Sequence, residues 1–229
     1  MRAVVIGQTV TTTGLWDLAE EFGWESDEAP ISQIIPEFAG RLCYKSWSKP
    51  NPATATNAGY IENLKEHKHF SVLEHSTVSF YFDGISRNLT HELVRHRHFS
   101  FSQVSQRYVD DLNTPVLYPD AVADLNASQW DALVEHNARA KVLYRDVRDA
   151  LKARGLPKKK AQQAARFILP GSTETAIVVT GNHRSWREFV DKRYSEFADP
   201  EIRELAGLVL TELRSIAPDI YSDFEDKEF

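Results

Sequence analysis

The sequence predicts a largely helical protein with a few short strands, folded as a single domain over residues 1–229. Two observations lead to this prediction. Apolar residues recur at helical spacing in several segments, and a few short runs rich in β-branched and aromatic residues read as strands. A hydrophobic fraction of 42% in 229 residues is enough for a sizeable core, and no repeat, low-complexity tract or long linker divides the chain.

The first third of the chain is predicted to begin with a strand and continue as helices. The expected elements are a strand over 3–7, a short helix over 15–22 and a helix over 31–42. Pro36 interrupts the last of these, so we expect a kink or a fresh start there. After a loop over 45–52, Thr54 or Thr56 is expected to cap a helix that runs towards His67.

The middle of the chain is predicted to pass from a strand through a helix into an extended segment. The β-rich run 77–82 is expected to end at Asp83-Gly84. Ser86 then caps a helix that delivers Arg95–Arg97 at its carboxyl end, where the helix dipole favours cations. Residues 99–102 alternate with period two, which indicates an extended chain, so the basic stretch is predicted to be a helix end plus a loop.

The second half is predicted to be dominated by helices. A capping box over 128–131 begins a helix that Gly155 and Pro157 end. Three lysines, 158–160, then open a helix that continues to Leu169 and contains Arg166; they form either a solvated face or an anion site. The remaining expected elements are a strand or buried helical segment over 175–180, a turn over 181–184, an aromatic helix reaching Arg193, and a helix from Asp199-Pro200 to Pro218.

One basic stretch stands out from an acidic chain. Arg95, Arg97 and Arg107 lie within 13 residues together with two histidines, serines, glutamines and aromatics, and no carboxylate interrupts them. Arginine offers paired donors that match phosphate and carboxylate oxygens. The net charge of −6 and the pI near 5.8 argue against a general nucleic-acid binder. A small anionic, planar ligand fits this pattern, and a solvated basic turn is the alternative.

Arginines elsewhere in the chain also indicate an anionic ligand. Several lie in segments with flanking apolar residues, and a partly buried arginine must find an anion. Too few carboxylates occur in these segments to satisfy them all locally, whereas a ligand with phosphates would do so. The arginines are Arg87, Arg95, Arg97, Arg107, Arg166, Arg184, Arg187 and Arg193.

Other chemistries have weaker support in the sequence. The single cysteine, Cys43, is more often a small buried hydrophobe than a nucleophile, and it permits no intramolecular disulfide. Neither a nucleophile elbow nor a glycine-rich dinucleotide or phosphate loop is present. The spacing of His67, His69, His75, His96 and His98 does not favour a metal site. No apolar run approaches about 18 residues and no signal-peptide pattern occurs, so we expect a cytoplasmic protein without membrane association.

The basic stretch and several other segments resemble those of a known family. Arg95-His96-Arg97, seven residues and then Ser105 match the signature of flavin-dependent thymidylate synthases, and the actinobacterial branch is the most similar. Further segments of residues 35–217 match as well. They are Arg41-x-Cys43-Tyr44, His69-x4-Glu74-His75, Glu92-Leu93-Val94, Gln106-Arg107-Tyr108, Ala165–Pro170, Asn182-His183-Arg184 and Arg193.

The resemblance implies an α+β fold, largely helical with a central antiparallel sheet, assembled as a homotetramer. It implies tightly bound FAD, one per subunit and shared between subunits, with NADPH and 5,10-methylenetetrahydrofolate as co-substrates. The implied reaction converts dUMP to dTMP, with reduced flavin relaying the folate methylene to uracil C5. The family uses no cysteine adduct to uracil, so the work falls on polarisation of the pyrimidine and on the flavin.

The resemblance also implies roles for individual residues. Arg193 would act on uracil as the catalytic residue. The dUMP-binding residues would be Glu92, Leu93, Val94, Arg95, Gln103, Val104, Ser105, Gln106, Arg107, Arg166 and Arg193. The FAD-binding residues would be Ser71, Arg95, His96, Arg97, Gln103, Asn182, His183, Arg184 and Glu188, and Tyr44 and His69 would face the folate or nicotinamide.

Four residues depart from commoner family patterns. Ser102-Gln103 stands where many members have Asn-Glu, Glu188 replaces Asn or His near the flavin, and Phe197 replaces a frequent His. Glu188 would repel the FAD phosphates. A nucleic-acid or nucleotide-binding module without turnover is the alternative function, which the net negative charge disfavours for nucleic acid.

Overall fold

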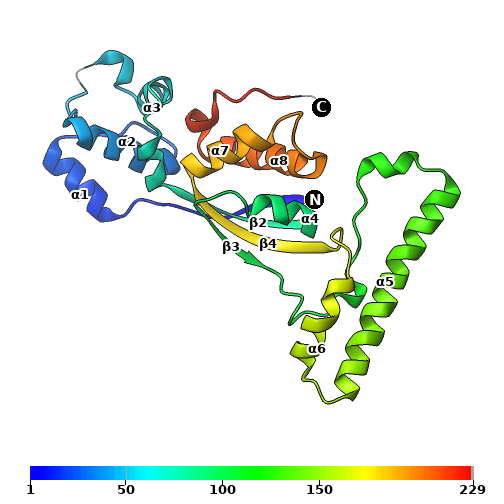
Figure 1. The fold of residues 1–229 in the computed structure, drawn as a ribbon. Coiled ribbons are helices and arrows are strands. Elements are labelled where there is room, and N and C mark those ends of the chain that lie inside the picture. Colours follow the sequence, from blue (N-terminus) through cyan, green and yellow to red (C-terminus); the bar gives the residue numbers. More distant parts are fainter. Residues whose placement is uncertain (50, 228–229) are drawn as a thin grey trace. The chain divides into compact units, whose positions relative to one another are not determined.

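The computed structural model describes residues 1–49 and 51–227, which fall into two compact units (Figure 1). Unit 1 comprises Met1, Phe82–Arg95 and Ser102–Ile177, and unit 2 comprises Arg2–Tyr81, His96–Phe101 and the chain from Val178 onward. The strands are β1 (Arg2–Gln8), β2 (Thr77–Ser86), β3 (Phe99–Gln103) and β4 (Glu174–Asn182). The helices are α1 (Thr13–Phe22), α2 (Ile31–Tyr44), α3 (Asn57–Glu66), α4 (Arg87–Leu93), α5 (Ala127–Ala153), α6 (Lys158–Ala165), α7 (His183–Arg193) and α8 (Pro200–Ile216).

The four strands form one antiparallel sheet in the order β1-β2-β4-β3, so the chain is helical with a sheet, as an α+β fold requires. Burial alternates along β4, which resolves the ambiguity over 175–180 in favour of a strand. The prediction that β2 ends at Asp83-Gly84 is wrong, because the strand continues to Ser86. Gly84 adopts a φ of +64°, and a Cβ there would lie 3.1 Å from the backbone of Met1, so glycine lets the strand pass this point.

An aromatic core in unit 2 holds α7 against the sheet residues of that unit. Trp186 is fully buried, donates from Nε1 to the carbonyl of Val78 at 3.1 Å and meets Phe80 edge to face at 4.9 Å. Phe99 packs on Trp186 at 4.4 Å, and a Cβ on Gly181 would come within 2.1 Å of the Phe99 ring. Because Gly181 belongs to β4 and the next residue caps α7 directly, the turn predicted over 181–184 is wrong.

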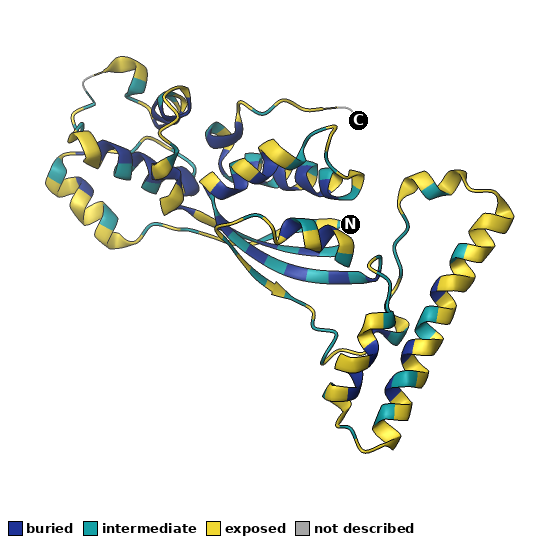
Figure 2. Cartoon of the chain, viewed as in Figure 1, coloured by how far each residue is buried: buried dark blue, intermediate teal, exposed yellow. Residues whose placement is uncertain are grey.

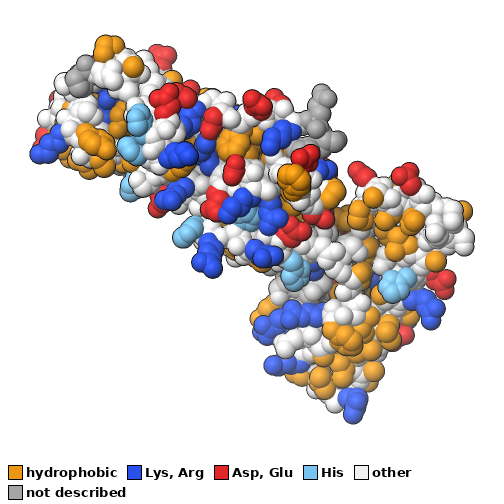
Figure 3. Space-filling model, turned by 45° about the horizontal axis from the view of Figure 1, so that its top comes forward, with side chains coloured by type: hydrophobic (Ala, Val, Ile, Leu, Met, Phe, Trp, Pro, Cys, Tyr) orange, Lys and Arg blue, Asp and Glu red, His pale blue; other side chains and the backbone are white. Residues whose placement is uncertain are grey.

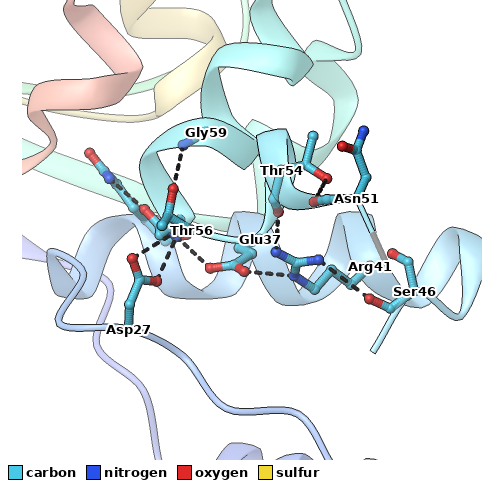
Figure 4. A network of polar contacts seen from close by, with 10 residues as sticks. Asp27, Glu37, Arg41, Ser46, Asn51, Thr54, Thr56 and Gly59 are labelled. Atoms are coloured by element: carbon cyan, nitrogen blue, oxygen red, sulfur yellow. Dashed lines mark hydrogen bonds and ion pairs between the residues drawn. The ribbon is translucent and has the colours of Figure 1, made fainter. Parts of the chain in front are cut away.

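A buried polar network fixes the end of α2 (Figure 4). Glu37, which is fully buried, accepts from Arg41 Nε at 2.6 Å and from Asn57 Nδ2 at 2.7 Å. Arg41 also donates to the carbonyls of Ser46 and Thr54, at 3.3 and 2.7 Å. A buried ion pair is tolerated when hydrogen bonds satisfy both partners, as they do here. Arg41 therefore anchors the segments on both sides of the loop that follows α2.

Helix α2 is continuous through Pro36, so no fresh start occurs there. Proline removes one backbone hydrogen bond in the second turn of this helix. The polar network one residue later, on Glu37, stabilises the helix against that loss. At the next helix, Thr56 is the cap, because its side chain accepts from the backbone N–H of Gly59 at 3.1 Å.

Three further predictions need correction at the ends of elements. The capping box of α5 is formed by Asn126 and Gln129, and Ser128 lies inside the helix. Arg166 lies outside α6, which ends at Ala165, and it begins a 3₁₀ turn, as chains often do before a proline. The residues after the basic helix end form strand β3 rather than a loop, although the expectation of an extended chain is confirmed. The N-cap predicted at Ser86 is also confirmed, because its side chain accepts from Leu89 N at 3.0 Å.

Helix α5 is the least buried of the long helices, as Figure 2 shows. Over its 27 residues only Asn137, Tyr144 and Arg148 are buried. The apolar stripe that predicted this helix therefore includes exposed side chains, with Leu143 52% exposed. Among residues 1–49 and 51–227, no helix combines the length and the apolar character needed to cross a membrane.

Candidate functional site

The structure divides the predicted ligand residues between the two units. Arg193 lies in unit 2, and every other residue expected to bind dUMP lies in unit 1. The unit 1 residues are Glu92, Leu93, Val94, Arg95, Gln103, Val104, Ser105, Gln106, Arg107 and Arg166. Leu93 is fully buried in the core, so its side chain is a packing group and only its backbone can meet a ligand.

The segment after β3 is fixed by side chains and backbone of unit 1. Gln103 Nε2 donates to the hydroxyls of Thr90 at 3.0 Å and Thr175 at 3.3 Å. The backbone of Val104 is held on both sides, because its N–H donates to Ala176 O at 3.0 Å and its carbonyl accepts from Arg87 at 2.7 Å. Residues 105–107 thus leave a rigid strand end, which suits a binding loop.

A turn follows at Ser105. Its carbonyl accepts from the N–H groups of Tyr108 at 3.1 Å and Val109 at 2.9 Å, and its hydroxyl accepts from Arg107 N at 3.4 Å. Beside this turn, Lys159 donates to the hydroxyl of Tyr108 and stands 4.3 Å from the centre of its ring. This contact with Lys159 lowers the pKa of Tyr108. The ammonium group of Lys159 is therefore held at the turn by a specific contact with Tyr108. A lysine on a purely solvated face would contact only water.

Arg87 lies near this turn; it is one of the arginines predicted from the sequence to need an anion, although the family resemblance gives it no place in the dUMP or FAD site. Desolvation by burial lowers the pKa of Arg87, Asp111 opposes this effect, and the like charge of Arg166 adds to it. The Nε atoms of Arg87 and Arg107 are buried and have no protein partner. Arginine stays charged under such conditions, so these donors require an anion or water. Arg87 and Arg166, whose charges act on each other, and the unpartnered Nε of Arg107 are thus candidate phosphate donors in unit 1.

In unit 2, Arg193 and His96 are in direct contact. Arg193 Nε donates to His96 Nε2 at 2.9 Å. Burial, with the charges of Arg193 and Lys192, lowers the pKa of His96 to about 4. The neutral imidazole is therefore the form present at neutral pH.

The residues expected to bind FAD fall into two kinds. Some are committed to structure: Asn182 Oδ1 accepts from Ser185 N at 2.8 Å as the cap of α7, and His183 is fully buried with its Nδ1 2.8 Å from the hydroxyl of Tyr221. Others are exposed, namely Ser71, Arg95, Arg97, Arg184 and Glu188. Among the exposed ones, Arg184 donates to Glu74 at 2.6 Å.

Glu188 is less adverse for an anion than its charge suggests. Its carboxylate pairs with Lys192 one turn later, and this hydrogen bond is the main cause of its lowered pKa. The pair is close to neutral as a whole. The repulsion expected between Glu188 and a phosphate is therefore reduced.

The residues expected on the folate or nicotinamide side lie at the surface of unit 2. Tyr44, at the end of α2, is 72% exposed. His69 is exposed, and its ring centre lies 5.7 Å from that of His67.

Cys43 is exposed rather than buried, which corrects the expectation of a small core hydrophobe. Within the described residues, no three His, Cys, Asp or Glu side chains form a group that could hold a metal ion.

Comparisons with known proteins identify relatives over most of the chain. The model of a family described as "Thymidylate synthase complementing protein" matches residues 27–219. A flavin-dependent thymidylate synthase of Mycobacterium tuberculosis is 50% identical over 209 residues, covering 88% of this chain and 83% of the relative. Enzymes with the same name from Mycobacterium avium and Mycolicibacterium vanbaalenii are 50% and 49% identical, with the same shares of each chain covered.

Proposed function

The chain belongs to the family of flavin-dependent thymidylate synthases, and we propose that it converts dUMP to dTMP. The methylene group of 5,10-methylenetetrahydrofolate would become the methyl group, and NADPH would supply the reducing equivalents through FAD. The observation that carries the proposal is the cationic group of unit 1, Arg87, Arg107 and Arg166, within a chain half identical to enzymes of that name. Within it, the Nε donors of Arg87 and Arg107 have no protein partner and would be available to a monophosphate.

The phosphate of dUMP is the ligand that best explains these arginines. A dianionic phosphate would satisfy the buried Nε donors of Arg87 and Arg107 and would offset the repulsion between Arg87 and Arg166. Charge-assisted hydrogen bonds are each worth about 1.5–3 kcal/mol. Ser105 and Gln106, on the rigid turn after β3, would position the nucleotide, and Gln103 would support them from the strand end. Arg87 is thus an addition to the dUMP-binding residues that the family resemblance implies.

The chemistry on the pyrimidine is assigned to Arg193. Its guanidinium would stabilise negative charge that develops on uracil N3 and the neighbouring oxygen, which activates C5 without a covalent bond to the enzyme. Cys43 is exposed and its Sγ donates to the Ala39 carbonyl at 3.4 Å, a contact without any base. A thiolate mechanism would require an activating partner. The surroundings of Cys43 therefore support a mechanism without a thiol.

FAD fits the exposed donors of the predicted set. We propose that Arg97, Arg184 and Ser71 of unit 2 bind its pyrophosphate and that Arg95 is a further FAD ligand, while the Glu188–Lys192 pair leaves little net repulsion. When bound, FAD supplies the redox chemistry. Asn182 and His183 would support the FAD site indirectly. They form the start of α7 and so place Arg184 on the surface. Tyr44 and His69 remain the proposed groups for the folate or nicotinamide.

We further propose that the active form is a cytoplasmic homotetramer in which the single catalytic domain, residues 1–229, shares FAD with neighbouring copies. Support comes from exposed hydrophobic side chains of α5 and of the 3₁₀ turn after α6, a region in which Figure 3 shows hydrophobic surface. Val134, Val142 and Leu143 of α5 are 42%, 45% and 52% exposed, and Phe167 is 80% exposed. Contiguous exposed apolar surface is typical of protein interfaces. Contact with other copies would remove it from water.

The proposal is tested with the purified protein in two stages. A bound flavin gives a yellow protein that absorbs near ~450 nm. NADPH oxidation is then followed with and without dUMP and methylenetetrahydrofolate, and dTMP is assayed. Formation of dTMP that requires both substrates is the expected result. Nucleotide binding without dTMP would instead leave a nucleotide-binding module without turnover, and a yellow protein that forms none would be a flavoprotein with another reaction.

A further inference from the structure

We propose that His96 is a positioning residue for Arg193: its neutral ring, through Nε2, holds the guanidinium in the orientation in which it acts on the pyrimidine. The inference rests on the function proposed above for Arg193. It gives His96 a role towards Arg193 in addition to the FAD contact that the family resemblance implies. His96 stands 97 positions from Arg193 in the sequence, and the fold of unit 2 brings the two together.

The contact determines the protonation state of the ring. Arginine has only donors, so the 2.9 Å contact between Arg193 Nε and His96 Nε2 requires a lone pair on Nε2. The proton of the neutral ring must then be on Nδ1. A protonated His96 would place two cations face to face and lose the bond. His96 can hold Arg193 only as this one tautomer of the neutral imidazole.

Apolar packing holds the ring in place for this contact. The centre of the His96 ring lies 5.3 Å from that of Phe189, edge to face, and 6.3 Å from that of Phe99. Phe189 is fully buried, so it is a rigid support. Phe189 and Arg193 are one turn apart on α7 and therefore lie on the same helix face. That face both packs the ring and donates to it.

Burial and the surrounding charges keep His96 neutral. Burial is the main cause, the charges of Arg193 and Lys192 of α7 add to it, and Glu188 on the same helix opposes them and is itself paired with Lys192. On the side of β3 the neighbour is the neutral ring of Phe99. The pKa of about 4 that results agrees with the acceptor role that the geometry requires.

A hydrogen bond at Nε restricts the rotation of the guanidinium plane. Arginine has many rotamers, and its catalytic value depends on the direction of its planar donors. Fixing the plane before the nucleotide binds avoids an ordering cost in the transition state. Loss of the acceptor should therefore lower kcat, whereas a purely structural role would lower stability and flavin content instead.

The test compares His96→Gln with His96→Met. The two side chains have similar length and volume, but only glutamine can present an oxygen near the position of Nε2. Both variants are loaded with FAD to the occupancy of the parent before kcat is measured, and we expect both to keep the thermal stability of the parent. His96→Gln should keep kcat within about 10-fold, and His96→Met should lose about 10- to 100-fold in kcat with little change in the Kd of dUMP, the scale of one hydrogen bond to a charged group.

A double-mutant cycle connects the effect to Arg193. If His96 acts through the arginine, His96→Met should have almost no further effect on kcat in an Arg193→Gln background. Equal loss in the Gln and Met variants, or full additivity with Arg193→Gln, would overturn the proposal. Production of dTMP by the parent protein tests the underlying function separately.

A spectroscopic readout does not depend on turnover. In protein with ¹⁵N-labelled histidine, the signal that disappears in His96→Gln belongs to His96. We expect that signal to report an unprotonated Nε2 and a protonated Nδ1 at neutral pH. A protonated Nε2 would contradict the proposal even if the enzyme makes dTMP.

Discussion

Replacement of Arg87 by methionine tests the phosphate site of unit 1 most specifically. Arg87 has a buried Nε without a protein partner; burial disfavours its cationic form, Asp111 opposes this effect and the charge of Arg166 adds to it. In the protein alone, the variant loses one hydrogen bond to Val104 O and the attraction of Asp111, but it also removes a desolvated charge close to that of Arg166. We therefore expect its stability to change by no more than about 1 kcal/mol.

The effect on nucleotide binding should be much larger. A charge-assisted hydrogen bond to phosphate is worth about 1.5–3 kcal/mol, which corresponds to a loss of about 10- to 150-fold in affinity. The Kd of dUMP for the FAD-loaded protein is measured by calorimetry. Arg139→Met is the matched control, because Arg139 is 81% exposed and its ion pair with Glu135 spans 3.8 Å. It removes the same charge and should leave the affinity within about 2-fold.

Deoxyuridine separates a phosphate contact from a general effect. It lacks the phosphate, so Arg87→Met should change its binding by less than about 2-fold while dUMP binding falls by at least about 10-fold. Equal losses for dUMP and deoxyuridine would refute the reasoning, because Arg87 would then act on the fold of the site. An unchanged Kd for dUMP would refute it as well.

Three further predictions follow from the contacts described. Arg193→Ala should lower kcat by at least ~10²-fold while FAD stays bound, as loss of one preorganised electrostatic group does; full activity would remove Arg193 from the mechanism. Cys43→Ala should retain most dTMP formation, and a correctly folded but inactive variant would revive a thiol mechanism. Burial lowers the pKa of His183 to about 3, so below about pH 6.5 the unfolded chain takes up a proton that the folded chain does not, and stability falls as the pH decreases. His183→Asn should flatten this dependence by about 1.4 kcal/mol per pH unit between pH 6 and 4 in denaturant titrations, whereas an unchanged slope would show that His183 titrates normally.

Structural features that depend only on residues adjacent in the sequence could be predicted correctly. Ser86 and Asp199 cap α4 and α8 as predicted, because an N-cap bond spans only two or three residues. The prediction of a helix start failed where two nearby residues could each serve as the N-cap. Asn126 and Ser128 are both good caps, and only Asn126 has Gln129 at the position that completes the box. Strand β2 continues past Gly84, where a Cβ would lie 3.1 Å from the backbone of Met1, and no local pattern contains that close approach.

The candidate site shows the same division. Composition and motif spacing indicated that arginines would bind anions, but not which ones lack partners. Arg87 was among the arginines noted, yet only burial and the nearby charge of Arg166 distinguish it from Arg187, which pairs with Asp223 at 2.6 Å. The contact of Arg193 with His96 joins residues 97 positions apart. Such pairs depend on the tertiary fold, which a single sequence read locally does not provide.

The central claim is that arginine side chains bind the nucleotide and polarise its ring without a covalent bond to the enzyme. A crystal structure of the protein with FAD and dUMP tests this claim most directly. We predict the guanidinium groups of Arg87, Arg107 and Arg166 within hydrogen-bond distance of the dUMP phosphate, and that of Arg193 at the uracil edge. A phosphate held by other groups, or uracil C6 bonded to Cys43, would contradict it.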